Sequence, residues 1–97
     1  MYKEKPTTSP VVCVDHDHEK YYIQIELPGV KKKDIDLTVA EQGFCIKGSR
    51  KDADLSGCYF LVHGVDPDKT KAKFENGLLD IVIPLKSPLI GKKIAVE

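Results

Sequence analysis

A cysteine, two histidines and two aspartates lie within residues 13–18, the densest group of potential metal ligands in the sequence. His16 and His18 are two positions apart, so in an extended segment both imidazoles would point to the same side. Imidazole and a thiolate such as that of Cys13 are typical ligands of zinc and copper. The charged residues 15–20 are equally typical of a turn between two strands. We therefore interpret the segment as a charged turn and expect neither a bound metal nor another cofactor.

Two further patterns could indicate an enzyme, and neither fits. Residues 43–49 contain two glycines, as a phosphate-binding loop does, but the lysine that should follow the second glycine is missing. Phe44 and Ile46 instead alternate as they would in a strand. His63 stands beside a glycine, and no serine, cysteine or aspartate has a spacing from it typical of a catalytic triad. The sequence therefore predicts a protein that is not an enzyme.

Length and charge exclude other classes of protein. The 97 residues suit one small domain. The formal net charge is zero, whereas nucleic-acid-binding domains usually carry a basic surface. No apolar run approaches the ~20 residues that span a membrane, and the N-terminus lacks the apolar segment of a secretory signal. We expect a cytoplasmic protein with no nucleic-acid or membrane partner.

The three cysteines, Cys13, Cys45 and Cys58, are odd in number and far apart in the sequence. This pattern is more typical of reduced intracellular thiols than of a disulfide framework. We expect Cys45 and Cys58 to pack as small buried apolar groups.

Short runs in which apolar and polar residues alternate predict a β protein. The predicted strands cover residues 11–14, 21–27, 35–39, 44–48, 58–62, 70–74 and 78–83, with a polar segment at 49–57 and a short helical turn at 65–69. Seven or eight short strands at this spacing predict an all-β, immunoglobulin-like antiparallel β-sandwich. We divide the chain into a flexible arm at residues 1–10, a sandwich domain at 11–86 and a C-terminal extension at 87–97.

Residues 72–84 predict a β-hairpin and a candidate binding surface. Asn76 and Gly77 both tolerate positive φ, as a two-residue hairpin turn requires. Beyond the turn one face of the strand is wholly apolar, and the other carries Leu78 and Val82 beside an aspartate. A strand that is apolar on both sides lies deep in a sandwich or is covered by another chain.

Several short motifs follow one another in a specific order. They are Leu-Pro-Gly-Val at residues 27–30, a basic-Asp-Ile step at 33–35, Ile-Lys-Gly-Ser-Arg at 46–50, Val-Asp-Pro-Asp-Lys at 65–69, Ala-x-Phe-x-Asn-Gly-x-Leu at 72–79 and Ile-Ala-Val at 94–96. In this order they closely resemble the α-crystallin domain of small heat-shock proteins. The resemblance implies an ATP-independent chaperone that holds non-native client proteins and assembles from dimers upward.

The resemblance also implies that Ile94 and Val96 form an Ile-x-Val self-assembly anchor on the tail. The two residues point the same way in an extended chain, and burying both contributes roughly 3–6 kcal/mol before ordering costs. The groove expected to receive the anchor, or a client, is formed by Leu78, Val82, Ile35, Leu37 and Val39. The competing interpretation of the tail is a last strand that completes its own sandwich.

Two features of the sequence differ from the small heat-shock proteins that it resembles. Bacterial and archaeal small heat-shock proteins carry a long loop that swaps into a partner, but residues 51–57 are too short to cross and return at ~3.5 Å per residue. The arm is also short and poor in aromatic residues. These features leave open a second class of protein, a monomeric CS-domain-like co-chaperone or interaction module without holdase activity. Its candidate docking surfaces would be the aromatic run Tyr59-Phe60 and the partly apolar face of Leu78 and Val82, and its monomeric mass would distinguish it from a chaperone assembly.

Overall fold

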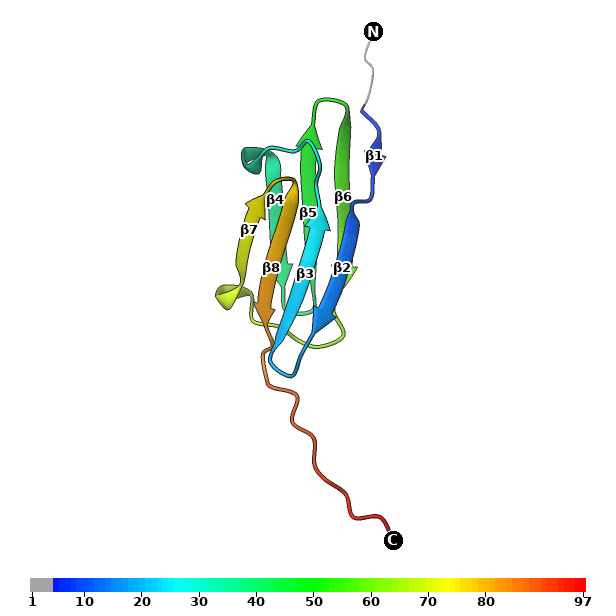
Figure 1. Ribbon diagram of the computed structural model, residues 1–97, viewed down its shortest axis with the longest axis vertical. Coiled ribbons are helices and arrows are strands. Elements are labelled where there is room, and N and C mark those ends of the chain that lie inside the picture. Colours follow the sequence, from blue (N-terminus) through cyan, green and yellow to red (C-terminus); the bar gives the residue numbers. More distant parts are fainter. Residues whose placement is uncertain (1–4) are drawn as a thin grey trace.

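Two four-stranded sheets make up the computed structural model of the protein, which describes residues 5–97 (Figure 1). The β5 sheet has the spatial order β1 (Thr7–Thr8), β6 (Ala53–Phe60), β5 (Gly43–Arg50) and β4 (Ile35–Ala40). The β8 sheet has the order β2 (Val11–His16), β3 (Lys20–Glu26), β8 (Leu78–Pro84) and β7 (Lys71–Glu75). Neighbouring strands are antiparallel, except that β1 runs parallel to β6. The predicted all-β antiparallel sandwich is confirmed.

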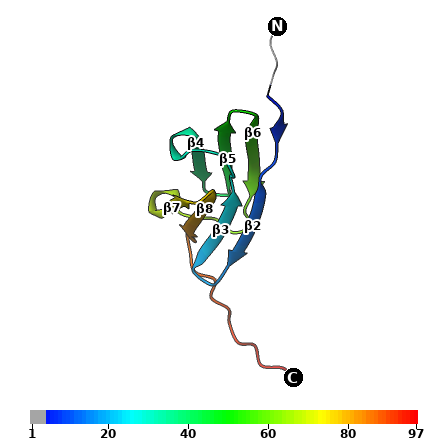
Figure 2. The same cartoon turned by 45° about the horizontal axis from the view of Figure 1, so that its top comes forward.

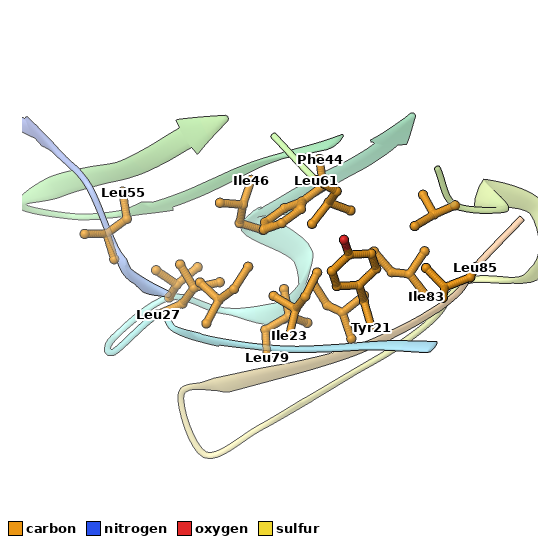
Figure 3. Close-up of a cluster of buried hydrophobic side chains, with 14 residues drawn as sticks. Tyr21, Ile23, Leu27, Phe44, Ile46, Leu55, Leu61, Leu79, Ile83 and Leu85 are labelled. Carbon is orange, nitrogen blue, oxygen red and sulfur yellow. The ribbon is translucent and has the colours of Figure 1, made fainter. Parts of the chain in front are cut away.

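The core lies between the two sheets and follows from the alternation in the sequence (Figure 3). β3, β5 and β8 each send every second side chain into this space, while the residues between them point outward. The cluster includes Tyr21, Ile23, Ile25, Leu27, Phe44, Ile46, Leu79, Ile81 and Ile83. Each aliphatic side chain buried in this way contributes about 1.5–3 kcal/mol, and the alternation determines which side chains enter the core.

The β7–β8 hairpin turns at Asn76 and Gly77, whose φ angles are 52° and 79°. Glu75 and Leu78 pair across these two residues, as the type I′ turn of a tight hairpin requires. The backbone N–H of Leu27 donates a hydrogen bond of 2.7 Å to the carbonyl of Gly77. The turn is therefore also tied to the end of β3.

Within residues 5–97, two 3₁₀-helices lie in connections between strands, η1 (Lys32–Asp34) and η2 (Pro67–Lys69). The carboxylate of Asp66 accepts a hydrogen bond of 3.1 Å from the backbone N–H of Asp68 and so caps η2. Pro67 occupies the first turn, where its missing N–H costs nothing. This confirms the short helical turn predicted at residues 65–69.

Most of the polar segment 49–57 is strand, so the prediction of no strand there, with a short loop at residues 51–57, is wrong. β5 runs on to Arg50 and β6 begins at Ala53, so that only residues 51 and 52 form the turn. Ala53 and Leu55 are buried, and the polar residues Asp54 and Ser56, which alternate with them, are partly exposed. The prediction missed this strand because polar residues occupy its outward positions.

The apolar run 58–62, predicted as a buried strand, is also divided differently. β6 ends at Phe60, and the side chains of Phe60 and Val62 are 80% and 82% exposed. Leu61, which lies between them, is buried. The unbroken apolar run therefore gives one buried residue, one half-buried residue (Tyr59) and three exposed residues, because period-two alternation continues through it.

Cys45 and Cys58 are joined by a disulfide, contrary to the prediction of reduced, buried thiols. They are direct partners in the β5–β6 register, and both are exposed on the outer face of the β5 sheet. The hairpin turn explains the pairing, since every β5–β6 pair, this one included, is symmetric about residues 51 and 52. Cys13 is free and exposed.

The described segments at the two ends of the chain are both extended (Figures 1 and 2). The described part of the arm lies along β6, with β1 paired to Asp54 and Leu55, and the ammonium group of Lys5 is 3.3 Å from the Asp54 carboxylate. Residues 1–4 of the predicted arm lie outside the described part of the chain. At the other end, the N–H of Leu89 donates to the His18 carbonyl at 2.9 Å, and no strand follows.

Candidate groove and tail anchor

β4 forms an open edge of the sandwich. It pairs with β5 on one side, and among residues 5–97 no strand pairs with its other side. Ile35, Leu37 and Val39 point inward and are half-buried against the core, while the three residues that alternate with them are exposed. An unpaired edge offers backbone N–H and C=O groups to an incoming extended segment. The half-buried aliphatic side chains beside it would provide apolar contacts for that segment.

β7 forms the corresponding edge of the other sheet, and the two views place β4 over β7 and β8 on the same side of the sandwich (Figures 1 and 2). β7 pairs only with β8 in the described residues. Its Phe74 is half-buried against the core, as the inward residues of β4 are. We refer to the inward faces of Ile35, Leu37 and Val39, together with Phe74, as the β4 groove.

Leu78 and Val82 do not belong to this groove. In β8 the inward positions are Leu79, Ile81 and Ile83, so Leu78 and Val82 point to the outer face of the β8 sheet. The five residues predicted to form one groove therefore separate into two sets, on opposite sides of the β8 sheet. Because one strand has two faces, its apolar content alone does not show which face meets β4.

The outer face of the β8 sheet has a shallow hollow of its own. Val82 lies in it opposite Tyr22, and Cys13 borders it from β2. The side-chain amide of Gln24 donates a hydrogen bond of 3.0 Å to the Asp80 carboxylate within the same hollow. Polar pairs thus divide this apolar surface, whereas the inward residues of β4 form an uninterrupted aliphatic row.

The tail is free of the sandwich beyond Leu89. Leu89 is half-buried against the core, but Ile90, Ile94 and Val96 are 86%, 70% and 94% exposed. Figure 1 shows the tail extending away from both sheets. The tail residues therefore do not complete their own sandwich in this structure, and their apolar side chains are available to another surface.

The residues considered as metal ligands are not brought together. Cys13 pairs with Gln24 on the outer face of the β8 sheet, whereas His16 pairs with the buried Tyr21. The imidazole of His16 packs against the rings of Tyr21 and His63, with ring centroids 5.2 Å and 5.1 Å apart. Within residues 5–97, no three His, Cys, Asp or Glu side chains are arranged to hold a metal ion.

Asp17 organises the turn between β2 and β3. Its carboxylate accepts hydrogen bonds of 2.8 Å from the backbone N–H groups of Glu19 and Lys20, and one of 3.0 Å from the Tyr22 hydroxyl. The donors, the Glu19 N–H foremost, lower the pKa of Asp17 because they stabilise its charged form. The hydrogen bond that the Tyr22 hydroxyl donates to Asp17 in turn raises the pKa of Tyr22. The predicted charged turn thus exists, but it is confined to residues 17–19 because β2 extends to His16.

The unpaired edge of β4 and the exposed apolar tail are surfaces of the kinds through which proteins bind one another. The family model of the Hsp20/alpha crystallin family matches residues 14–97. The chain therefore belongs to the Hsp20/alpha crystallin family. Members of this family are small heat-shock proteins, which are ATP-independent chaperones rather than enzymes, and the family is known to form oligomers and to bind non-native proteins.

Individual relatives agree with this assignment. A probable 15 kDa heat shock protein of Leptospira interrogans is 28% identical, over 92% of this chain and 78% of that protein. Small heat shock protein C2 of Rickettsia felis is 31% identical, over 91% of this chain and 68% of that protein. The structure of heat shock protein 16.0 from Schizosaccharomyces pombe has a TM-score of 0.75 at 25% identity and covers 92% of this chain and 98% of that one. No helix within residues 5–97 is long and apolar enough to cross a membrane.

Proposed function

We propose that this protein is an ATP-independent holdase that binds exposed apolar segments of unfolding proteins. The observation that carries the proposal is the unpaired edge of β4, which lies beside the half-buried aliphatic row of Ile35, Leu37 and Val39. An unfolding protein exposes extended, apolar segments. Such a segment can add to the edge as a strand and place alternate side chains on the row. Neither step uses a nucleotide.

The same groove also receives the tail of a second copy in this proposal. Residues 87–97 then act as an extension, and the side chains of Ile94 and Val96 would both point at the groove when the tail is extended. Burying both would contribute roughly 3–6 kcal/mol before the cost of ordering the tail. Tail and client would compete for one surface, so the tail would act as a reversible cover.

An aggregation assay tests the holdase activity. A heat-sensitive test protein is warmed without ATP, and its light scattering is followed with and without this chain. We expect the chain to suppress the scattering in proportion to its concentration. Undiminished scattering at a several-fold molar excess of the chain would contradict the proposal.

Tail variants test the anchor in the same samples. We expect the double variant Ile94→Ala with Val96→Ala to shift the molar mass to smaller species, because it removes both anchoring side chains. Ile90→Ala is the matched control, since Ile90 is also an exposed apolar residue of the tail. If the double variant and the wild-type protein have identical masses, the anchor assignment is wrong.

The short turn between β5 and β6 supports a second candidate function, that of a CS-domain-like interaction module. β5 and β6 are joined by a turn at residues 51 and 52, so no segment there is long enough to swap into a partner. A CS-domain-like interaction module would share this feature, and the exposed Phe60 would lie on its docking surface. A constant monomeric mass together with no suppression of aggregation would favour this alternative. We propose the cytoplasm as the site of action, which fractionation of the source cells would test.

A further inference from the structure

The disulfide between Cys45 and Cys58 lies on the outer face of the β5 sheet, away from the β4 groove and the tail. We propose that these two cysteines are a reversible thiol–disulfide site, which opens and closes within the folded sheet by exchange with small thiols and disulfides. The proposal rests on three features: the exposure of the pair, the ladder that holds it, and its place near the free end of β6.

Both cysteines are accessible to a small reactant. Their side chains are exposed, in contrast to Phe44 and Ile46, which flank Cys45 and point into the core. A hollow borders the disulfide and is lined in part by Thr38, Ala40 and Phe60. Thiol–disulfide exchange requires a thiolate to reach one sulfur of the bond, so access is a first condition for reversibility.

The sheet holds the pair together without the sulfur–sulfur bond. β5 and β6 pair over eight residues on each strand, from Gly43 with Phe60 to Arg50 with Ala53. Within this ladder the Cα atoms of Cys45 and Cys58 are 4.1 Å apart. Reduction therefore breaks one covalent bond but leaves both thiols opposite one another. The pair can close again without any search through the unfolded chain.

The exchange needs two equivalents of a small thiol. The first thiolate attacks one cysteine sulfur, breaks the disulfide, forms a mixed disulfide and releases the other cysteine as a thiolate. The second thiolate attacks the sulfur of the small molecule in that mixed disulfide and releases the remaining cysteine. The small thiols leave as their own disulfide, having lost two electrons and two protons to the protein. Oxidation by a small disulfide is the reverse of this sequence.

Reduction would loosen one end of β6. β1 pairs only with Asp54 and Leu55, so among residues 5–97 the segment of β6 that contains Cys58 and Phe60 has a single neighbouring strand, β5. The disulfide is a second tie between this segment and β5. Without it we expect faster amide hydrogen exchange at residues 57–60 and a lower melting temperature, with the fold retained.

Thiol counting under native conditions tests the proposal. The experiment uses the full chain with Cys13→Ser, which removes the free thiol. We expect no titratable thiol after treatment with oxidised glutathione and two per chain after dithiothreitol, with unchanged far-ultraviolet circular dichroism. We also expect the rate of reduction to change less than about two-fold when urea is added below the unfolding transition, since no global opening is required.

A trivalent arsenical tests whether the reduced thiols remain adjacent. Phenylarsine oxide condenses with two neighbouring thiols and releases water, so we expect one arsenic bound per reduced chain. The single variants Cys45→Ser and Cys58→Ser, each with Cys13→Ser, are the matched controls and should bind much more weakly.

Three results would overturn the proposal. The first is that thiols are released only in step with unfolding. The second is that oxidised glutathione produces disulfide-linked dimers instead of the internal bond. The third is that the folded, reduced chain binds no more arsenical than the single-cysteine variants.

Discussion

Gly77 has a backbone conformation that other side chains tolerate poorly. Its φ of 79° lies in the left-handed region, which β-branched residues strongly disfavour. A Cβ atom built there would be 3.5 Å from the Cα of Pro28, an ordinary van der Waals contact. The requirement for glycine therefore comes from the turn itself and not from crowding. Asp17 likewise fixes a turn, the one between β2 and β3, but it does so through the hydrogen bonds that its carboxylate accepts.

We expect Gly77→Val to destabilise the fold by about 1–3 kcal/mol, because valine must adopt a strained φ or distort the hairpin. Chemical denaturation of the two proteins measures this difference in free energy. Gly91→Val is the matched control, because a Cβ atom at Gly91 would have no heavy atom within 4 Å and the residue lies in the exposed tail. Coincident unfolding curves for wild-type protein and Gly77→Val would contradict the prediction.

The lowered pKa of Asp17 predicts a dependence of stability on acid. Its folded pKa lies below the unfolded value of 3.8, so its contribution to stability is fully present above that pH and is lost as the pH falls through the folded pKa. Asp17→Asn removes this titration. Melting temperatures between pH 5 and pH 2 should therefore fall more steeply for the wild-type protein than for the variant. Parallel profiles would show that the hydrogen bonds around Asp17 do not stabilise its charged form.

At the scale of elements, β4 and β8 show how two strands with similar apolar content take different roles. β4 lies at an edge and leaves its inward side chains half-buried, whereas β8 lies inside its sheet and buries Leu79, Ile81 and Ile83 almost completely. The outward side chains of β8 then form a separate surface. The aliphatic row belongs to a strand that is itself an edge, whereas Leu78 and Val82 belong to a strand that is paired on both sides, which makes the β4 groove the better receptor for an extended tail.

A peptide of residues 90–97 distinguishes the two surfaces. We expect Leu37→Ala, which shortens the centre of the aliphatic row of β4, to weaken binding of the peptide by roughly 10-fold, or about 1.4 kcal/mol. Val82→Ala is the matched control, since Val82 is also half-buried but lies on the outer face of the β8 sheet. Fluorescence anisotropy of the labelled peptide measures both affinities. A larger loss with Val82→Ala would place the receptor on the other surface.

At the scale of the whole molecule, the elongated shape follows from the free tail. The principal extents are 72 × 23 × 20 Å, and Figure 1 shows the tail lying along the longest direction. A molecule with an exposed apolar tail at one end and an unpaired strand edge on its side can link to further copies of itself. The zero formal net charge leaves little electrostatic repulsion to oppose such contacts.

We expect the molar mass of the protein to fall on dilution. One tail in one groove gains only roughly 3–6 kcal/mol before ordering costs, which is weak for a contact between proteins. Light scattering across a dilution series from hundreds of micromolar downward should therefore show progressive dissociation. A large mass that does not change with concentration would indicate a different and stronger interface.

The sequence by itself determined the alternating pattern and therefore most of the fold. Tyr21, Ile23 and Ile25 are buried as predicted, because every second residue of a strand faces the same side. Asn76 and Gly77 marked their turn because few other residue pairs adopt two successive positive φ angles. These features depend on local stereochemistry, which a short stretch of sequence contains in full. The ordered motifs likewise indicated the family before any coordinates were known.

Only the tertiary structure decided which faces and which strands meet. It joined Cys45 to Cys58, because that pairing depends on a register set at the hairpin turn. It also separated Leu78 and Val82 from the inward residues of β4. The alternation shows which residues share one face of a strand. Contacts between distant segments decide which other strand that face packs against. Those contacts arise from the packing of two whole sheets, which no single stretch of the chain encodes.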